Sequence, residues 1–154
     1  MNPLELYIQM NKFDKSNGLV LTAKKPGDIQ YEMKVLEKHL SSPNTCHGGA
    51  ISGMMDAVIG STALSMAFTE GNLVSTVEFK INYFKPVFEG ETLIGTGVIE
   101  FTGKSLMVTS GKIIKKDSSD LVAIAQGTFN IYPMEKRDFL NLLSPDEWSV
   151  SFET

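Results

Sequence analysis

Residues 47–69, HGGAISGMMDAVIGSTALSMAFT, form a long apolar stretch that decides the fold of this chain. Apolar side chains recur in it at spacings of three, four and seven residues, a period typical of an α-helix. The apolar arc is broad, so we expect other parts of the chain to cover most of the helix. The recurring side chains are those of Ile51, Met54, Met55, Val58, Ile59, Ala63 and Met66.

Asp56 carries the one formal charge of this stretch and has apolar neighbours on both sides. Burial of an unpaired carboxylate is costly, so Asp56 must be neutral, partnered or functional. A capped or ion-paired structural acid is one interpretation, and a catalytic acid is the other. A membrane span of about 20 apolar residues is disfavoured, because glycines, hydroxyl side chains and the central acid interrupt the stretch.

The bulk composition narrows the class of protein. A length of 154 residues predicts one domain with its own core. The net charge of −4 shows no block of like charge, which argues against a nucleic-acid partner. One cysteine and two histidines predict no internal disulfide, no metal site and no cofactor. The N-terminus lacks a secretory signal pattern, so we expect a cytoplasmic protein without membrane partners.

Strand patterns surround the helix. An amphipathic helix is predicted within residues 1–14, and a short helix within residues 135–143. Two strands, at 18–24 and 29–38, precede the apolar stretch, and a loop at 39–46 joins them to it. Four longer strands follow the stretch, at residues 73–84, 91–101, 104–115 and 121–132. In the first of these, a period of two sets Val77, Phe79, Ile81 and Tyr83 against Thr76, Glu78, Lys80 and Asn82.

This order of elements predicts an α+β fold. A curved antiparallel sheet of five to six strands, four of them in a meander, would wrap around one long central helix. The wrapped sheet explains why the helix lacks a polar face. The outer surface of the sheet would then be partly apolar and meet a second copy of the chain, which predicts a homodimer or a larger assembly.

His47-Gly48-Gly49 ends a loop, and Asp56 follows nine residues after the histidine on the apolar helix. Ser75-Thr76-Val77-Glu78 and Tyr83-Phe84-Lys85-Pro86 come next along the chain. In this order the landmarks resemble the hotdog-fold acyl-CoA thioesterase superfamily, and within it the PaaI-like group, which is similar to phenylacetyl-CoA thioesterase. The resemblance covers residues 29–132 of a single domain 1–154. It leaves an N-terminal extension, 1–28, and a tail, 133–154, without a functional account.

The resemblance implies hydrolysis of an aryl- or medium-chain acyl-CoA. Gly48 would donate its backbone N–H to the thioester oxygen at the start of the helix. Asp56 would act as general base or as nucleophile, two roles that the sequence leaves open. The Thr76 hydroxyl would help to place the water, and His47 would lie near the thioester. In that family the acid and the glycine of one site come from different protomers, which implies a homodimer or a dimer of dimers.

Each of these assignments has a purely structural alternative. The two glycines are also suited to turning a loop into a helix. His47 also suits the start of a helix, and Thr76 is a common strand former. Cys46 is interpreted as a buried thiol, since nothing in the sequence indicates a lowered pKa.

Further residues are candidates for substrate binding. Many relatives carry an asparagine six residues before the histidine, where this chain has Ser41, and Asn44 lies three residues before it. Either side chain is a candidate for that polar contact. An acyl pocket is suggested by methionines of the helix, Met55 among them, and Gly49 belongs to the matched motif. CoA phosphates would meet basic side chains on the matching strands, with Lys80, Lys85 and Lys104 as candidates.

Two other functions remain open at this point. The chain is also compatible with a hotdog module that binds acyl-CoA without hydrolysing it. The retained carboxylate argues against a pure binder, which gains nothing from a desolvated acid. A hotdog hydratase or dehydratase is the second alternative, although its characteristic motifs are not evident.

Overall fold

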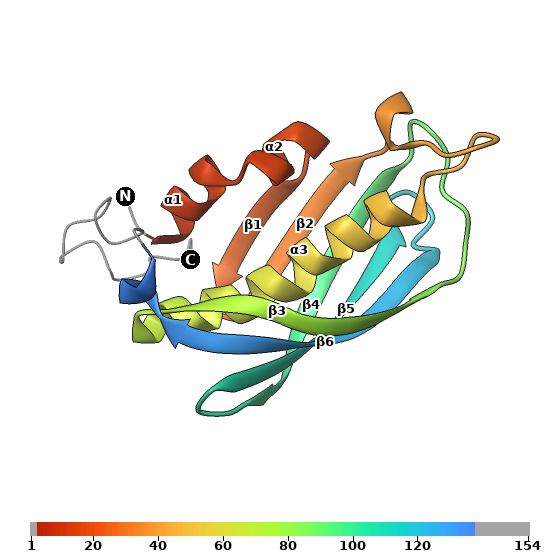
Figure 1. Cartoon of the computed structure of the whole chain (residues 1–154). Coiled ribbons are helices and arrows are strands. Elements are labelled where there is room, and N and C mark those ends of the chain that lie inside the picture. Colours follow the sequence, from red (N-terminus) through yellow and green to blue (C-terminus); the bar gives the residue numbers. More distant parts are fainter. Residues whose placement is uncertain (1–2, 138–154) are drawn as a thin grey trace.

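The computed structural model describes residues 3–137, and it consists of one antiparallel sheet and a long helix across the concave face of that sheet (Figure 1). The helix is α3, Gly48–Ala67. The six strands are β1 (Val20–Lys25), β2 (Asp28–Lys34), β3 (Asn72–Tyr83), β4 (Thr92–Thr102), β5 (Leu106–Lys115) and β6 (Leu121–Pro133). The short helices are α1 (Pro3–Met10), α2 (Lys12–Asn17), η1 (Glu37–His39), η2 (Phe68–Glu70) and η3 (Met134–Lys136).

The predicted α+β sheet and central helix are confirmed, whereas the predicted four-strand meander is wrong. The strand order is β1-β2-β4-β5-β6-β3, so only β4, β5 and β6 form a meander. β3 pairs with β6 at one edge of the sheet, and β4 pairs with β2. A period of two identifies the residues of a strand but not its neighbours, because both arrangements bury the same face.

Several predicted boundaries also shift. The strand predicted at 29–38 ends at Lys34. Its predicted last residues belong instead to η1, which begins at Glu37. The helix predicted within residues 1–14 is two short helices, separated at Asn11, whose side chain accepts the Asp14 N–H at 3.0 Å and caps α2. Of the helix predicted at 135–143, the structure has only the turn η3, and residues 138–143 lie outside the described part of the chain.

The sheet accepts α3 at close range because its strands carry glycine where the large helix side chains meet them. A Cβ on Gly111 would lie 2.6 Å from Cγ2 of Ile59, and one on Gly127 would lie 2.9 Å from its Cδ1. Gly95 makes the same room beneath Val58. Overpacking of a core typically costs about 1–3 kcal/mol. These glycines are therefore part of the reason why the helix rests directly on the sheet.

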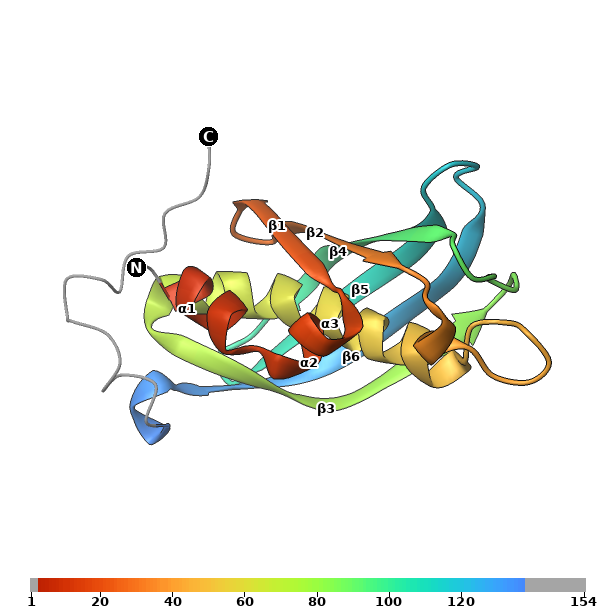
Figure 2. The same cartoon turned by 90° about the horizontal axis from the view of Figure 1, so that it is seen from above.

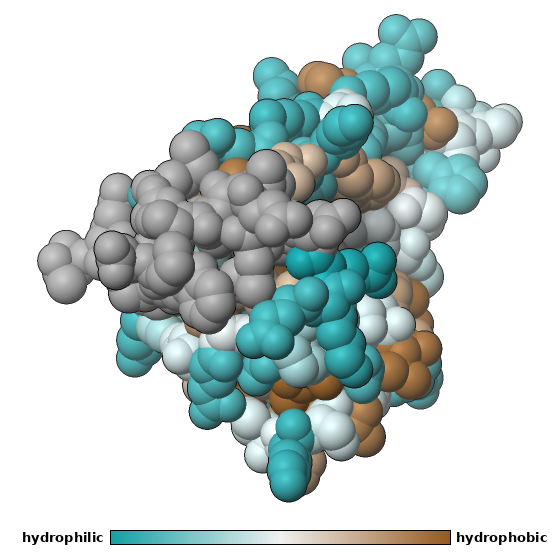
Figure 3. Space-filling model, turned by 60° about the vertical axis from the view of Figure 1, so that its left-hand side comes forward, coloured by the Kyte–Doolittle hydropathy of each residue, from teal (hydrophilic) through white to brown (hydrophobic). Residues whose placement is uncertain are grey.

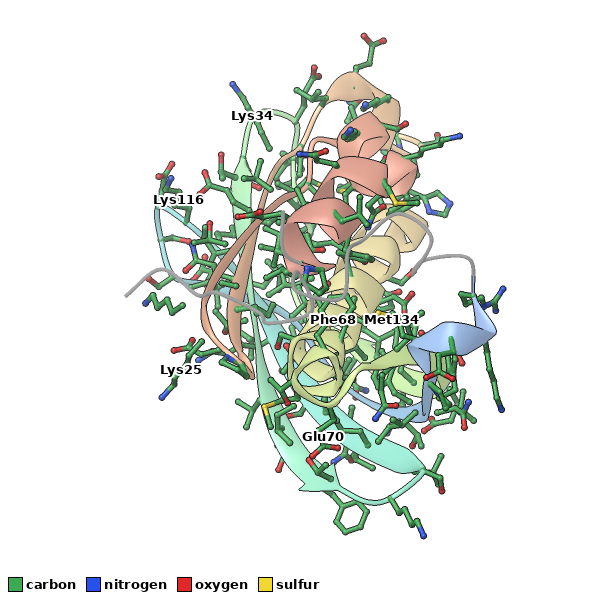
Figure 4. All side chains as sticks on the ribbon, turned by 90° about the vertical axis from the view of Figure 1, so that its left-hand side faces the viewer. Lys25, Lys34, Phe68, Glu70, Lys116 and Met134 are labelled. Carbon is green, nitrogen blue, oxygen red and sulfur yellow. The ribbon has the colours of Figure 1, made fainter. Side chains whose placement is uncertain are left out.

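A second apolar cluster closes the end of the domain where α3 finishes. Phe68 and Met134 lie next to each other in this cluster, whereas Lys25, Lys34 and Lys116 project outward (Figure 4). The other buried members of the cluster are Leu4, Leu64 and Leu73. The contact of Leu4 with this cluster attaches α1 to the main body of the fold.

The apolar side chains of α3 are mostly buried in the interior of the domain. Residues Gly48–Glu70 are long and apolar enough to resemble a membrane span, but 67% of the apolar window is buried inside the fold. The surface drawn in Figure 3 mixes hydrophilic and apolar patches. The core helix of a folded domain accounts for such a pattern.

Candidate active site

Asp56 lies half-buried on the face of α3 that looks toward the edge strand β3 and the N-terminal helices. Its sequence neighbours Met54 and Met55 are fully buried in the core and do not line the cavity beside Asp56, so the expected contact of the carboxylate with these two side chains is not found. Asp56 Oδ1 instead accepts a hydrogen bond from Thr76 Oγ1 at 2.8 Å. The acid is therefore partnered, and it remains accessible from one side.

A bulge in β3 brings Thr76 to this position. The pairing of β3 with β6 shifts by one residue between Thr76 and Glu78. A bulge reverses the alternation of side chains beyond it. Thr76 therefore faces α3, as Phe79 does further along the strand. The predicted period of two is wrong at this point, since it set Thr76 on the face opposite Phe79 and left no signal for the extra residue.

Asp56 and Thr76 open into a cavity of about 420 Å³. Its walls come from α1, α2, α3, β3 and β6, and Figure 2 shows the two N-terminal helices lying over α3, between β1 and β3. The wall residues include Tyr7, Phe13, Asp14, Ser61 and Phe129. Sequence reasoning missed Tyr7, Phe13 and Asp14, which lie in the extension 1–28. An aromatic or acidic residue on a short helix is too common to be singled out there.

One end of this cavity is polar. Tyr31 Oη donates a hydrogen bond to Asp14 Oδ2 at 2.7 Å and lies 3.0 Å from Ser61 Oγ. Asn11 Nδ2 donates to Tyr7 Oη at 2.9 Å. Within residues 3–137, Asp14 Oδ1 has no hydrogen-bond partner, although the residue is only 6% exposed. Burial raises the pKa of the Asp14 carboxyl, against the opposing effect of the hydrogen bond from Tyr31.

The start of α3 forms a second, smaller site. His47 is the N-cap residue, and its Nδ1 accepts the Gly49 N–H at 2.7 Å. The Gly48 N–H makes no hydrogen bond within the described residues, so it is available to a ligand. Tyr83 Oη donates to the Gly48 carbonyl at 3.1 Å, and Lys85 lines the same hollow of about 310 Å³. Of the two predicted glycines, only Gly48 therefore presents an unused backbone donor.

Asp56 and Gly48 are not brought together within one chain. They are eight residues apart on one helix, a separation of about 12 Å along its axis. Two groups that act on one carbonyl must both lie within hydrogen-bond reach of it. A single chain therefore holds the two halves of the predicted site at different places.

The remaining polar and apolar candidates lie elsewhere. The Ser41 N–H and hydroxyl both donate to the Thr45 carbonyl, at 2.7 and 3.3 Å, so this side chain stabilises its own loop. Asn44 is exposed in the same loop. Met55 is fully buried in the core and does not line the cavity beside Asp56.

The three predicted lysines occupy three different places. Lys85 lies beside the start of α3 and pairs with Asp120 at 3.3 Å, where both side chains are largely exposed. Lys80 lines a hollow of about 830 Å³ on the outer face of the sheet. Lys104 is exposed in the turn between β4 and β5. The outer hollow is the larger one, but the acid and its hydroxyl partner face the cavity over α3, so that cavity is the candidate active site.

Cys46 lies next to the motif but is unsuited to nucleophilic attack. The residue is buried, and this burial raises the pKa of its thiol to about 11. A thiol rather than a thiolate is therefore present at neutral pH. Residues 3–137 contain no group of three His, Cys, Asp or Glu side chains arranged to hold a metal ion.

Sequence comparisons connect this geometry to known proteins. Residues 43–122 match the sequence model of the thioesterase superfamily. Human acyl-coenzyme A thioesterase 13 is 30% identical over 110 residues, which are 71% of this chain and 77% of that protein. A protein of Archaeoglobus fulgidus is 32% identical over 104 residues, 68% of this chain. The chain spans only 64% of the length of that archaeal relative.

Comparisons of structure agree with the fold. The PaaI protein from the phenylacetic acid degradation operon of Escherichia coli superposes with a TM-score of 0.75 at 19% identity, over 84% of this chain and 91% of that one. A thioesterase protein of Streptococcus pneumoniae, solved with coenzyme A, has a TM-score of 0.68 at 21% identity, over 75% and 86%. These matches confirm the predicted hotdog arrangement of sheet and helix.

Proposed function

Because the chain belongs to the thioesterase superfamily, we propose that it hydrolyses an acyl-CoA to the free acid and CoA, with the Asp56 carboxylate as the catalytic group. The observation that carries this proposal is the Asp56–Thr76 pair, whose carboxylate opens into a cavity. The similarity to human acyl-coenzyme A thioesterase 13 supports CoA as the carrier of the acyl group.

Asp56 acts on the thioester carbonyl either through water or directly. As general base it removes a proton from water while the water oxygen attacks the carbonyl carbon. As nucleophile it attacks that carbon itself, and water then hydrolyses the resulting anhydride. In both cases the C–S bond breaks and the CoA sulfur leaves as a thiolate. The hydrogen bond from Thr76 to Oδ1 would orient the carboxylate and leave Oδ2 to act on the water or the carbonyl carbon.

The Gly48 N–H would stabilise the oxygen of the tetrahedral intermediate. It is the first N–H of α3, where the helix dipole favours negative charge. A donor of this kind is typically worth about 10²–10³-fold in rate. Lys85, in the same hollow, is the best placed of the three lysines to meet a CoA phosphate.

A dimer would complete the active site. β3 is an edge strand of 12 residues, and its Val77 side chain is 58% exposed. Asp56 contacts β3 at Thr76, and Gly48 contacts the same strand at Tyr83. Antiparallel pairing of two β3 strands would place Thr76 of one chain near the other end of the second strand. Asp56 would then lie near the partner's Gly48, which resolves the separation of about 12 Å.

The cavity beside Asp56 suits an aryl or medium-chain acyl group. Its volume of about 420 Å³ is that of a small-ligand pocket. Phe13 and Phe129 supply aromatic walls, and Leu64 and Val74 supply aliphatic ones.

The first experiment measures thiol release from a panel of phenylacetyl-, benzoyl- and saturated acyl-CoAs, comparing the wild type with Asp56→Asn. This substitution keeps the shape of the side chain and removes the base. We expect kcat to fall at least ~100-fold, with unchanged folding by circular dichroism. Unchanged activity would exclude Asp56 as the catalyst. Tight binding without thiol release would favour a binding module, and activity on enoyl-CoA alone would favour a hydratase.

A second experiment tests the site shared between protomers. Gly48→Pro removes the N–H at the first helical position, where proline is well accepted. Gly48→Ala is the matched control, because its Cβ would lie 3.7 Å from the Tyr83 ring, an ordinary contact. We expect Gly48→Pro and Asp56→Asn to be inactive alone. Mixed subunits should recover about a quarter of wild-type activity, since half of the dimers are mixed and half of their sites intact. No recovery on proven subunit exchange would exclude the shared site.

A further inference from the structure

Phe13, from the N-terminal extension, forms one wall of the cavity beside Asp56. It belongs to α2, one of the two short helices that lie over α3 in Figure 2. A Cβ on Gly53 of α3 would lie only 2.8 Å from Cζ of the Phe13 ring, so the tip of the ring rests on the helix at this glycine. Glycine destabilises the interior of a helix relative to alanine. The close approach of the ring gives a reason for glycine at position 53.

This contact places the ring close to the carboxylate of Asp56. Gly53 precedes Asp56 by three residues on α3. Residues with this spacing are neighbours on one face of a helix, with about 5–6 Å between their Cβ positions. Phe13 and Asp56 also line the same cavity. An acyl group whose carbonyl carbon lies at Asp56 therefore enters a space that the Phe13 ring borders.

Attachment of α2 to the fold does not depend on this ring. The next residue, Asp14, is buried, and its Oδ2 accepts the Tyr31 hydroxyl at 2.7 Å. The Phe13 carbonyl accepts Nδ2 of Asn17 at 3.0 Å, which holds the backbone of Phe13 itself. The end of the ring contacts α3, and the residue is nevertheless 51% exposed. An aromatic surface on a fixed backbone is thus left at the cavity wall, where an apolar ligand group can cover it.

We propose that Phe13 is a specificity-determining residue, whose ring packs against the acyl group of the substrate and selects large apolar acyl groups over acetyl. Contact between the ring and a long acyl chain removes apolar surface of both from water. An acetyl group offers only a methyl group to this contact, so it gains much less. The inference rests on the proposed function, since it takes Asp56 to mark the position of the thioester. It gives the N-terminal extension a role in the choice of substrate.

The test compares a long and a short acyl group. Thiol release from hexanoyl-CoA and acetyl-CoA is measured with the wild type and with Phe13→Ala. We expect kcat/KM of the wild type to favour hexanoyl-CoA, and Phe13→Ala to lower this ratio at least about tenfold, since even one methylene in an apolar pocket is worth about 10–200-fold. A ratio that is unchanged in Phe13→Ala would overturn the proposal, as would a wild type without the preference.

Phe101 supplies the matched control. Its ring also packs on a glycine, since a Cβ on Gly103 would lie 2.9 Å from Cε1 of Phe101, and the residue is 59% exposed. Among the described residues, Phe101 is not part of the cavity wall beside Asp56, so Phe101→Ala should keep the wild-type ratio. Phe13→Leu retains an apolar side chain and should restore part of the preference. Each ratio is measured within one protein, so a partial loss of folded protein does not affect it. An equal fall in Phe101→Ala would contradict the role of Phe13.

Binding separates this proposal from the proposed function. Calorimetry on Asp56→Asn protein, with and without Phe13→Ala, measures the affinity for hexanoyl-CoA without turnover. We expect the double variant to bind hexanoyl-CoA at least about tenfold more weakly, while the affinity for acetyl-CoA changes less. This result supports the role of Phe13 even if the wild type releases no thiol, an outcome that would overturn the proposed hydrolysis alone. Equal affinities of the two proteins for hexanoyl-CoA would overturn the role of Phe13 and leave the hydrolysis standing.

Discussion

The two long faces of α3 are built on opposite principles. On the sheet side, the helix presents large apolar side chains such as Met55 and Ile59, and the strands carry glycines such as Gly111 where these side chains pack. On the cavity side, the helix presents small or polar residues at Gly53, Asp56, Ala57, Gly60 and Ser61. Large side chains from other elements approach them there, as Phe13 does at Gly53.

This difference indicates a division between stability and function within one helix. The sheet side is close-packed on both partners, so a change of volume has nowhere to relax. The cavity side borders an open volume and a half-exposed aromatic ring, which can move. Substitutions on the two faces should therefore separate into those that change unfolding and those that change catalysis.

The largest effect of this kind is expected at Met55. Met55→Ala removes a fully buried side chain and leaves a cavity under the sheet. We expect the free energy of unfolding to fall by about 2–5 kcal/mol, with kcat per folded molecule unchanged. Urea unfolding and active-site titration measure the two quantities. Met55→Leu conserves volume and should cost less than about 1.5 kcal/mol. A catalytic effect from a fully folded Met55→Ala protein would contradict the division.

A matched pair of glycine substitutions compares the faces directly. Gly111→Ala places a Cβ 2.6 Å from Cγ2 of the buried Ile59, so we expect a loss of about 1–3 kcal/mol. Gly53→Ala places a Cβ 2.8 Å from the Phe13 ring tip, on a side chain that is 51% exposed. The ring can swing away, and helix propensity then favours alanine by up to about 1 kcal/mol. Thermal unfolding ranks the two variants, and equal destabilisation would contradict the difference between the two faces of α3.

On the cavity side, Thr76 should affect rate more than stability. Thr76→Val keeps the shape and removes the hydrogen bond to Asp56 Oδ1. A hydrogen bond to a charged group such as this carboxylate is worth about 1.5–3 kcal/mol, so we expect kcat to fall roughly 10- to 150-fold. Thr76→Ser retains the hydroxyl and should stay near the wild-type rate. A serine variant as slow as the valine variant would show that the methyl group matters instead.

The smallest effect is a pH dependence at Asp14. Its pKa is raised in the folded protein by burial, so folding binds a proton more tightly there. This contribution to stability is fully present below the unfolded pKa of about 3.8 and is lost as pH rises through the folded pKa. Asp14→Asn removes this contribution. We expect its stability relative to the wild type to improve from about pH 4 to about pH 7.

Chemical denaturation of both proteins at several pH values measures this difference. Parallel stability curves for wild type and Asp14→Asn across that range would contradict a raised pKa at Asp14.

Residues 47–69 were sufficient to predict the central helix, since a period near 3.6 is a property of the chain itself. These residues were also sufficient to predict that the helix begins at His47-Gly48 and that Asp56 is its one charge. The position of β3 was not predictable in this way, because alternation says nothing about which strand lies beside it. The bulge at Thr76 was equally hidden, since one extra residue leaves no mark in a strand composed of β-formers.

The sequence by itself determined the family, the helix and the acid on it, because these rest on local spacing and on an ordered set of landmarks. Only the tertiary structure decided what surrounds that acid. Thr76 reaches Asp56 through a bulge on a strand 20 residues away, and Asp14 reaches the cavity from the N-terminal extension. Contacts between distant segments depend on strand order and packing, which no local pattern in the chain encodes.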